Sequence, residues 1–151
     1  MNRRLMSRRL PAALIVTAML AGCAPKSEPP APTGPKTTTI AISYDDLLNQ
    51  KNITRDVTLA VGDTLQISLG SNASTGYRWN PDMQISNSAV LVQAGHEMIT
   101  PSGSQAGTPG SEVWALQALG RGAATVKGSY GRPWPGGEQD AWTFTARVTV
   151  N

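Results

Sequence analysis

The chain has 151 residues, 40% of them hydrophobic, and carries 13 Lys and Arg against 10 Asp and Glu. This length suffices for one hydrophobic core, so a single domain is expected. The chain holds a single cysteine, Cys23, which excludes an internal disulfide.

The N-terminal residues read as a targeting signal. Four Arg precede an apolar run, residues 12–20, that is too short to span a bilayer. Leu20-Ala21-Gly22-Cys23 follows and resembles the lipobox of bacterial lipoproteins, in which the Cys is lipidated and becomes the mature N-terminus. We therefore expect residues 1–22 to be a cleaved signal peptide and Cys23 to anchor the protein to a membrane of the bacterial cell envelope, facing outside the cytoplasm. A spare thiol behind a plain signal peptide is the alternative, and the Arg pairs fit Tat export as well as Sec export.

The leader also accounts for the basic charge of the chain. Residues 1–22 contain four Arg and no acidic residue, so the remainder carries nine basic and ten acidic side chains, a net charge of −1. No basic patch is left, and we expect no nucleic-acid partner. Residues 23–36 comprise the lipidated Cys and a Pro-rich tether without an aliphatic side chain larger than Ala.

Residues 37–151 are predicted to form one all-β domain, which we expect to be a monomer. Residues 45–50 interrupt the strands as one helical turn, and residues 100–110 hold small and polar residues typical of a long loop. Short alternating strands separated by turns, without a period of 3.6 residues, favour an immunoglobulin-like β-sandwich. The predicted strands cover residues 37–43, 57–61, 65–69, 77–79, 89–98, 112–119, 123–130 and 140–150.

Residues 130–137, Tyr-Gly-Arg-Pro-Trp-Pro-Gly-Gly, are predicted to be a stiff loop, because two Pro and three Gly interrupt a regular strand. Arg132 and Trp134 are residue types enriched among interface hot spots. Trp134 either binds a partner or folds back as a lid over the end of the sandwich, and residue types alone leave both open.

Three loop motifs occur in order, and an alternating strand follows each. They are Asn72-Ala73-Ser74-Thr75-Gly76, Gly107-Thr108-Pro109-Gly110 and Arg132-Pro133-Trp134. Residues 55–151 thereby resemble the chagasin family of cysteine-peptidase inhibitors, whose loops carry N-P-T-T-G, G-x-G-G and R-P-W. The third motif is intact, whereas the first departs at Ala73 and Ser74 and the second at Pro109.

The resemblance implies an immunoglobulin-like sandwich whose three loops occlude the cleft of a papain-like cysteine peptidase reversibly. It places residues 72–76 near the catalytic Cys of the peptidase, residues 107–110 along the non-primed side and residues 132–134 on the primed side. Small side chains at Ala73, Ser74 and Gly76 suit a narrow cleft. Trp134 offers apolar area and an N–H donor, and Arg132 can pair with a carboxylate or brace its own loop.

Other classes of function find less support in the sequence. No motif indicates an enzyme, and we expect no cofactor or metal, because His96 is the only histidine. Glu112 and Glu138 could form a carboxylate pair, but nothing in the sequence places them together. A non-inhibitory immunoglobulin-like lipoprotein of the envelope, using the same loops to bind a protein or a glycan, remains the alternative.

Overall fold

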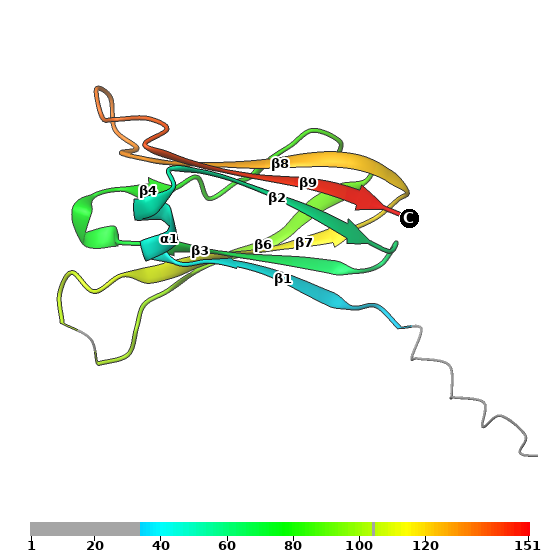
Figure 1. Cartoon of the computed structure of the whole chain (residues 1–151), viewed down its shortest axis with the longest axis horizontal. Helices are drawn as coiled ribbons and strands as arrows, with labels where there is room; N and C mark the ends of the chain where they lie inside the picture. The colour runs from blue at the N-terminus through cyan, green and yellow to red at the C-terminus, as the bar shows by residue number, and fades with distance from the viewer. Residues whose placement is uncertain (1–33, 104) are drawn as a thin grey trace, which may run out of the picture. The chain divides into compact units, whose positions relative to one another are not determined.

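The structure, a computed structural model, describes residues 34–103 and 105–151 (Figure 1). The predicted signal peptide, Cys23 and most of the predicted tether lie outside these residues. Within them the fold is all-β apart from one short α-helix and one 3-10 turn, and no helix has the length and hydrophobicity of a membrane span. The elements are β1 (Thr37–Ile42), α1 (Tyr44–Asn49), β2 (Asn52–Leu59), β3 (Thr64–Ser71), η1 (Ala73–Thr75), β4 (Arg78–Trp79), β5 (Gln84–Ile85), β6 (Leu91–Ile99), β7 (Gly110–Ala118), β8 (Gly122–Gly131) and β9 (Trp142–Val150).

The strands form two sheets that lie as separate layers (Figure 1). One sheet has the order β1-β3-β7-β6, and the other has the order β2-β9-β8-β4 with β5 also paired to β8. Two neighbouring pairs are parallel, β1 with β3 and β2 with β9, and the remaining pairs are antiparallel. In this order β1 and β2 lie at the edges of their sheets.

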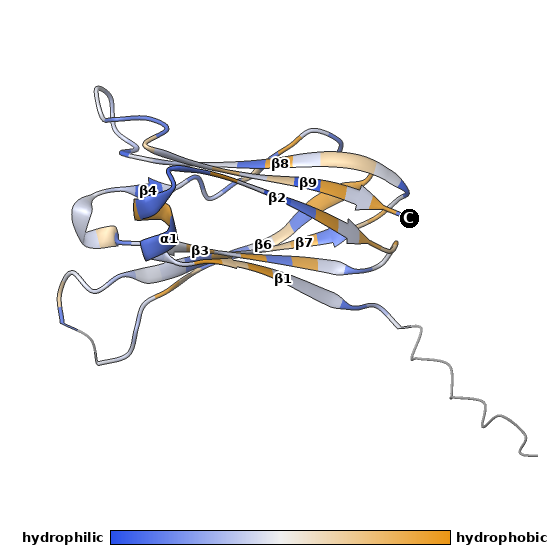
Figure 2. Cartoon of the chain, viewed as in Figure 1, coloured by the Kyte–Doolittle hydropathy of each residue, from blue (hydrophilic) through white to orange (hydrophobic). Residues whose placement is uncertain are grey.

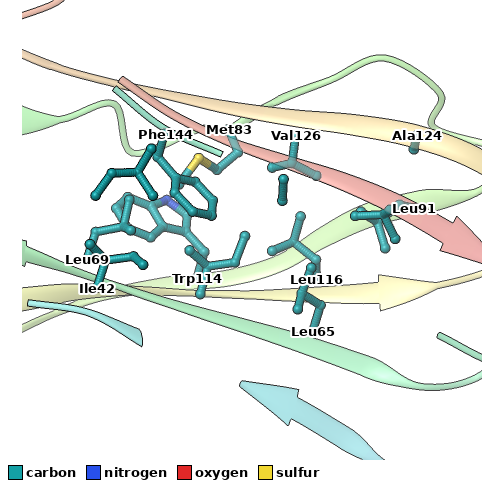
Figure 3. Close-up of a cluster of buried hydrophobic side chains, with 14 of the residues drawn as sticks. Ile42, Leu65, Leu69, Met83, Leu91, Trp114, Leu116, Ala124, Val126 and Phe144 are labelled. Carbon is teal, nitrogen blue, oxygen red and sulfur yellow. The ribbon is translucent and has the colours of Figure 1, made fainter. Parts of the chain in front are cut away.

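One hydrophobic core fills the space between the sheets (Figure 3). Leu65, Ile67 and Leu69 of β3 are fully buried, as predicted from their alternation. Trp114 and Leu116 of β7 meet the side chains of β8 and β9 across this core. Hydrophobic and polar residues alternate along the strands (Figure 2), because successive side chains of a strand point to opposite faces.

The short helix α1 forms where one helical turn was predicted. The Ser43 hydroxyl accepts the Asp46 N–H at 3.1 Å, and the Asp46 carboxylate accepts the Ser43 N–H at 3.1 Å, so the two residues form a capping box. The hydrogen bond from the Ser43 side chain lowers the pKa of Asp46. Leu47 is fully buried and ties α1 to the core.

Several predicted strand boundaries were wrong. The second strand begins at Asn52 and buries Ile53, but it ends at Leu59 and leaves Val61 about half exposed. The strand predicted over 89–98 is Leu91–Ile99. A register shift between Gln93 and Gly95 explains its irregular pattern.

The loop predicted from residue 130 begins two residues later. Tyr130 and Gly131 belong to β8 and pair with Trp79 and Arg78 of β4. Tyr130 is buried in the core, so it is not a loop residue. Gly131 is required in this strand because a Cβ atom there would lie 2.6 Å from the carbonyl oxygen of Glu138.

Candidate functional site

Three loops meet at one end of the domain. The first loop, residues 72–77, joins β3 to β4, the second loop, residues 100–109, joins β6 to β7, and the third loop, residues 132–141, joins β8 to β9. Ser71 pairs with Gly110, which brings the first and second loops together. Arg78 pairs with Gly131, which brings the end of the first loop to the start of the third (Figure 1). All three predicted motifs therefore lie at the same end.

The first loop is a capped 3-10 turn. The Asn72 side-chain oxygen accepts the Ser74 N–H at 3.3 Å and the Ser74 hydroxyl at 2.6 Å. The Thr75 hydroxyl donates to the Asn72 carbonyl at 2.7 Å, so this hydroxyl is engaged inside the loop. Gly76 ends the turn with φ +79°, a left-handed conformation that favours glycine. Ala73, at the position where the family motif has Pro, is the first residue of this turn.

Asn72 connects the first loop to its surroundings. Its backbone N–H donates to the Tyr130 hydroxyl at 3.0 Å, which anchors the loop to β8. Its side-chain amide donates to the Gly107 carbonyl at 2.9 Å, which joins the first loop to the second. Neither bond could be predicted from the sequence, because Tyr130 lies 58 residues from Asn72 and Gly107 lies 35 residues from it.

The second loop borders a hollow of about 270 Å³. Thr108 donates both its backbone N–H and its hydroxyl to the Gln105 carbonyl, and Gly107 has φ +90°. Thr108 and Pro109 are exposed. Gly110 is the first residue of β7, and a Cβ atom there would lie 2.3 Å from the Ile99 carbonyl oxygen. Glycine at this position is therefore required by the approach of β6 to β7, whatever its role toward a partner.

The third loop holds its shape through its own backbone. The Arg132 N–H donates to the Glu138 carbonyl at 2.7 Å, and the Gly137 N–H donates to the Trp134 carbonyl at 3.0 Å. The Gln139 amide donates to the Arg132 carbonyl at 2.7 Å. Together with the prolines at positions 133 and 135, these bonds restrict the loop before any partner arrives.

Trp134 is 48% exposed, so it is not a lid over the core. It packs instead against the first loop. A Cβ atom on Gly76 would lie 2.8 Å from Cη2 of Trp134, closer than such atoms approach in proteins. The first and third loops therefore touch at a point where only glycine fits beneath the indole.

Arg132 lies between aromatic rings. Its guanidinium carbon is 4.6 Å from the centre of the Tyr77 ring and 5.8 Å from that of Trp134. Among the described residues it forms no ion pair, so Arg132 braces its loop by stacking. The Tyr77 hydroxyl donates to the Glu138 carboxylate, and this hydrogen bond raises the pKa of Tyr77.

A stack of rings continues from this cluster into the core. Tyr77 stacks on Tyr130 at 5.6 Å between ring centres, and Tyr130 stacks on Trp142 at 4.6 Å. Tyr130 and Trp142 are buried. The exposed end of the third loop is thus connected through side chains to the centre of the molecule.

Glu112, which follows the second loop motif, is a carboxyl group whose burial was not predicted from the sequence. It is 2% exposed and lies beside Ser71, the backbone of Trp79 and the ring of His96. Its burial could have been predicted from the alternation in this strand, because Glu112 lies on the same face as the buried side chains of Trp114 and Leu116. Glu138 binds Tyr77 instead, so Glu112 and Glu138 belong to separate clusters. Within the part of the chain described, no group of His, Cys, Asp and Glu could hold a metal.

Comparison with known proteins agrees with the all-β fold and with the family resemblance. Residues 58–148 match the Chagasin family peptidase inhibitor I42. The chain is 28% identical to chagasin of Trypanosoma cruzi over 97 residues, which cover 63% of this chain and 88% of chagasin. It is 28% identical to amoebiasin-2 of Entamoeba histolytica over 104 residues, covering 69% of this chain and 84% of that protein.

Solved structures have the same fold. The cysteine protease inhibitor EhICP2 from Entamoeba histolytica superposes with a TM-score of 0.59 at 23% identity, covering 77% of this chain and 96% of that one. PbICP-C, solved in complex with falcipain-2, superposes with a TM-score of 0.55 at 23% identity, covering 77% and 99%. The chain belongs to the chagasin family of peptidase inhibitors. Membership of a family of inhibitors agrees with the expectation that the protein is not an enzyme.

Proposed function

We propose that the protein inhibits papain-like cysteine peptidases reversibly by filling their active-site cleft with the three loops. The observation that carries this proposal is the mutual locking of the loops at one end of the domain. Asn72 binds the second loop, and Gly76 lies against Trp134 of the third. Loops ordered in advance lose little entropy on binding, which favours affinity.

The residues suggest a division of roles among the loops. Residues 72–76 face the catalytic Cys, because small side chains and a tight turn let the backbone enter a narrow cleft. Residues 107–110 lie along the non-primed side, where exposed Thr108 and Pro109 meet the cleft wall. Residues 132–134 bind the primed side, with Trp134 as the apolar anchor. No catalytic group of the inhibitor takes part.

The structural relatives support both the fold type and the class of partner. The two facing sheets fit an immunoglobulin-like sandwich with the binding loops at one end. PbICP-C, which shares the fold, was solved in complex with falcipain-2. A monomeric domain with a free loop end would engage a peptidase in the same way.

We also propose that Cys23 anchors the protein by lipid to a bacterial envelope membrane. Support comes from Leu20-Ala21-Gly22-Cys23 and from the direction of β1. β1 is parallel to β3, and β3 runs toward the first loop, so Thr37 lies at the end opposite the loops. An anchor that precedes Thr37 leaves the loops free to face away from the membrane.

The Cys23→Ser variant tests the anchor. We expect the variant to appear in the soluble fraction, whereas the native protein fractionates with membranes and is released by detergent. A Cys23→Ser protein that still requires detergent for release contradicts lipidation at this residue.

Inhibition assays with papain and trypsin test the proposed function. The full chain should inhibit papain competitively and reversibly and leave trypsin unaffected, since the loops fit a cysteine-peptidase cleft. If the chain inhibits no papain-like enzyme at micromolar concentration, the alternative, a binding protein for another envelope partner, takes its place.

A further inference from the structure

The carboxyl group of Glu112 lies where the first and second loops meet the body of the domain. Glu112 comes two residues after Gly110, where β7 emerges from the second loop, and its side chain is 2% exposed. It also borders the hollow between the two loops, as does Ser71. A change in the position of this group would alter the spacing of the loops.

The contacts of Glu112 reach each strand that borders these two loops. Oε1 accepts the Ser71 hydroxyl at 2.9 Å and the Trp79 backbone N–H at 3.2 Å. Ser71 is the last residue of β3 before the first loop, and Trp79 belongs to β4 just after it. One oxygen therefore joins the two ends of the first loop.

The second oxygen reaches the strand that enters the second loop. Oε2 lies 3.0 Å from Nε2 of His96 on β6, and Nε2 is the donor in the tautomer that satisfies this oxygen. The His96 ring stacks on Trp114 at 4.8 Å, which fixes its orientation. Glu112 thus links β3, β4 and β6 to its own strand, β7.

Stability alone does not account for this arrangement. Burial of a polar group is costly unless hydrogen bonds compensate it, and well-packed apolar side chains often serve stability as well as a buried ion pair does. A carboxyl group instead requires donors at defined positions, and here the donors belong to both ends of the first loop and to β6. The carboxyl group of Glu112 therefore holds these strands at defined positions relative to one another.

We infer that Glu112 is a positioning residue that sets the spacing of the first and second loops for peptidase binding. It acts at the base of the loops, while the hydrogen bond from Asn72 to the Gly107 carbonyl acts nearer their tips. The effect on inhibition rests on the proposed function. The effect on loop order in the free protein does not.

The Glu112→Gln variant tests this inference against a matched control. Gln keeps the size of Glu but is neutral and replaces one acceptor oxygen by an NH2 donor. Its oxygen can still accept from Ser71 and Trp79, but its NH2 group then faces Nε2 of His96, so the hydrogen bond that His96 donates to Glu112 is lost. Asp63→Asn is the control. Asp63 is a carboxylate 4% exposed that accepts the N–H groups of Lys36 and Ala60 at 2.9 Å each, at the end opposite the loops.

Two readouts on the purified full chain separate positioning from general stability. With papain, Glu112→Gln should raise the inhibition constant about tenfold, the value of one charged hydrogen bond, while Asp63→Asn should stay within about twofold of the native protein. In the free protein, hydrogen exchange of the Thr75 and Gly76 amides should accelerate about tenfold in Glu112→Gln and stay unchanged in Asp63→Asn.

Each outcome decides the inference. Accelerated exchange confined to Glu112→Gln supports positioning even if the native protein inhibits no papain-like enzyme, a result that would refute the proposed function alone. Native exchange in Glu112→Gln overturns the inference. So does an Asp63→Asn variant that changes inhibition and loop exchange as much as Glu112→Gln does.

Discussion

Gly76 and Trp134 fix how the first and third loops meet. Gly76 has φ +79° and lies so close to the indole that no Cβ fits between them. Two separate reasons thus require glycine at this position. The backbone conformation disfavours other residues, and the contact with Trp134 excludes their side chains.

Alanine substitutions separate these two reasons. Gly62 has φ +92° at the opposite end of the domain, where a Cβ atom would meet only Pro35 at 3.9 Å. Both Gly76→Ala and Gly62→Ala should lose about 1 kcal/mol of unfolding free energy through backbone strain. Only Gly76→Ala should also displace Trp134, and we expect it to weaken papain inhibition about tenfold or more.

Equal inhibition by the two alanine variants contradicts this account of the contact. Inhibition constants measured beside urea unfolding curves give both quantities for each protein. Gly62→Ala should inhibit within about twofold of the native protein, because distant sites act independently.

At the scale of elements, Asp63 joins the start of β1 to the turn that precedes β3. Its carboxylate accepts the N–H groups of Lys36 and Ala60. The hydrogen bond from Lys36, followed by that from Ala60, lowers the pKa of Asp63 below its usual value. The unfolded chain therefore binds a proton at this residue at a pH where the folded chain does not.

The sign of the pH dependence follows from this lowered pKa. The stabilisation by Asp63 is complete above the ordinary Asp value of about 4, and it is lost as the pH falls through the lower folded pKa. Asp63→Asn should be less stable than the native protein at pH 7. The difference between the two should shrink below about pH 4, which urea unfolding followed by Trp fluorescence measures. A difference that stays constant down to about pH 2 would show that Asp63 contributes nothing through ionisation.

At the scale of the whole molecule, the features predicted correctly from the sequence were those that a local pattern of residues determines. Strands such as β3 and β9 were found because alternation with a period of two marks one buried face. The order of the loop motifs pointed to the family, and the match over residues 58–148 confirmed it. The prolines and glycines after residue 131 predicted the third loop, whose start was placed two residues too early.

Contacts between distant parts of the chain could not be predicted in this way. Glu112 meets Ser71 across 41 residues, and Tyr77 meets Glu138 across 61. Such contacts depend on the pairing of strands, which residue types alone do not specify. The stacking of Arg132 between Tyr77 and Trp134 could not be predicted either, because the motif allowed Arg132 to pair with a carboxylate or to brace its own loop.

The described domain has two distinct ends. The described chain enters at the end that carries Asp63, and the three loops occupy the other end. Trp134 is the large apolar side chain that the third loop exposes at the loop end. The account of the protein as an inhibitor therefore depends most on this residue.

The inhibition constant of Trp134→Ala against papain, beside that of the native protein, tests the account most directly. Trp134 is 48% exposed, so its removal should leave the unfolding free energy near the native value. Loss of an aromatic anchor typically costs about 2 kcal/mol or more, so inhibition should weaken at least ~30-fold. A folded Trp134→Ala protein that inhibits papain as strongly as the native protein would contradict the account.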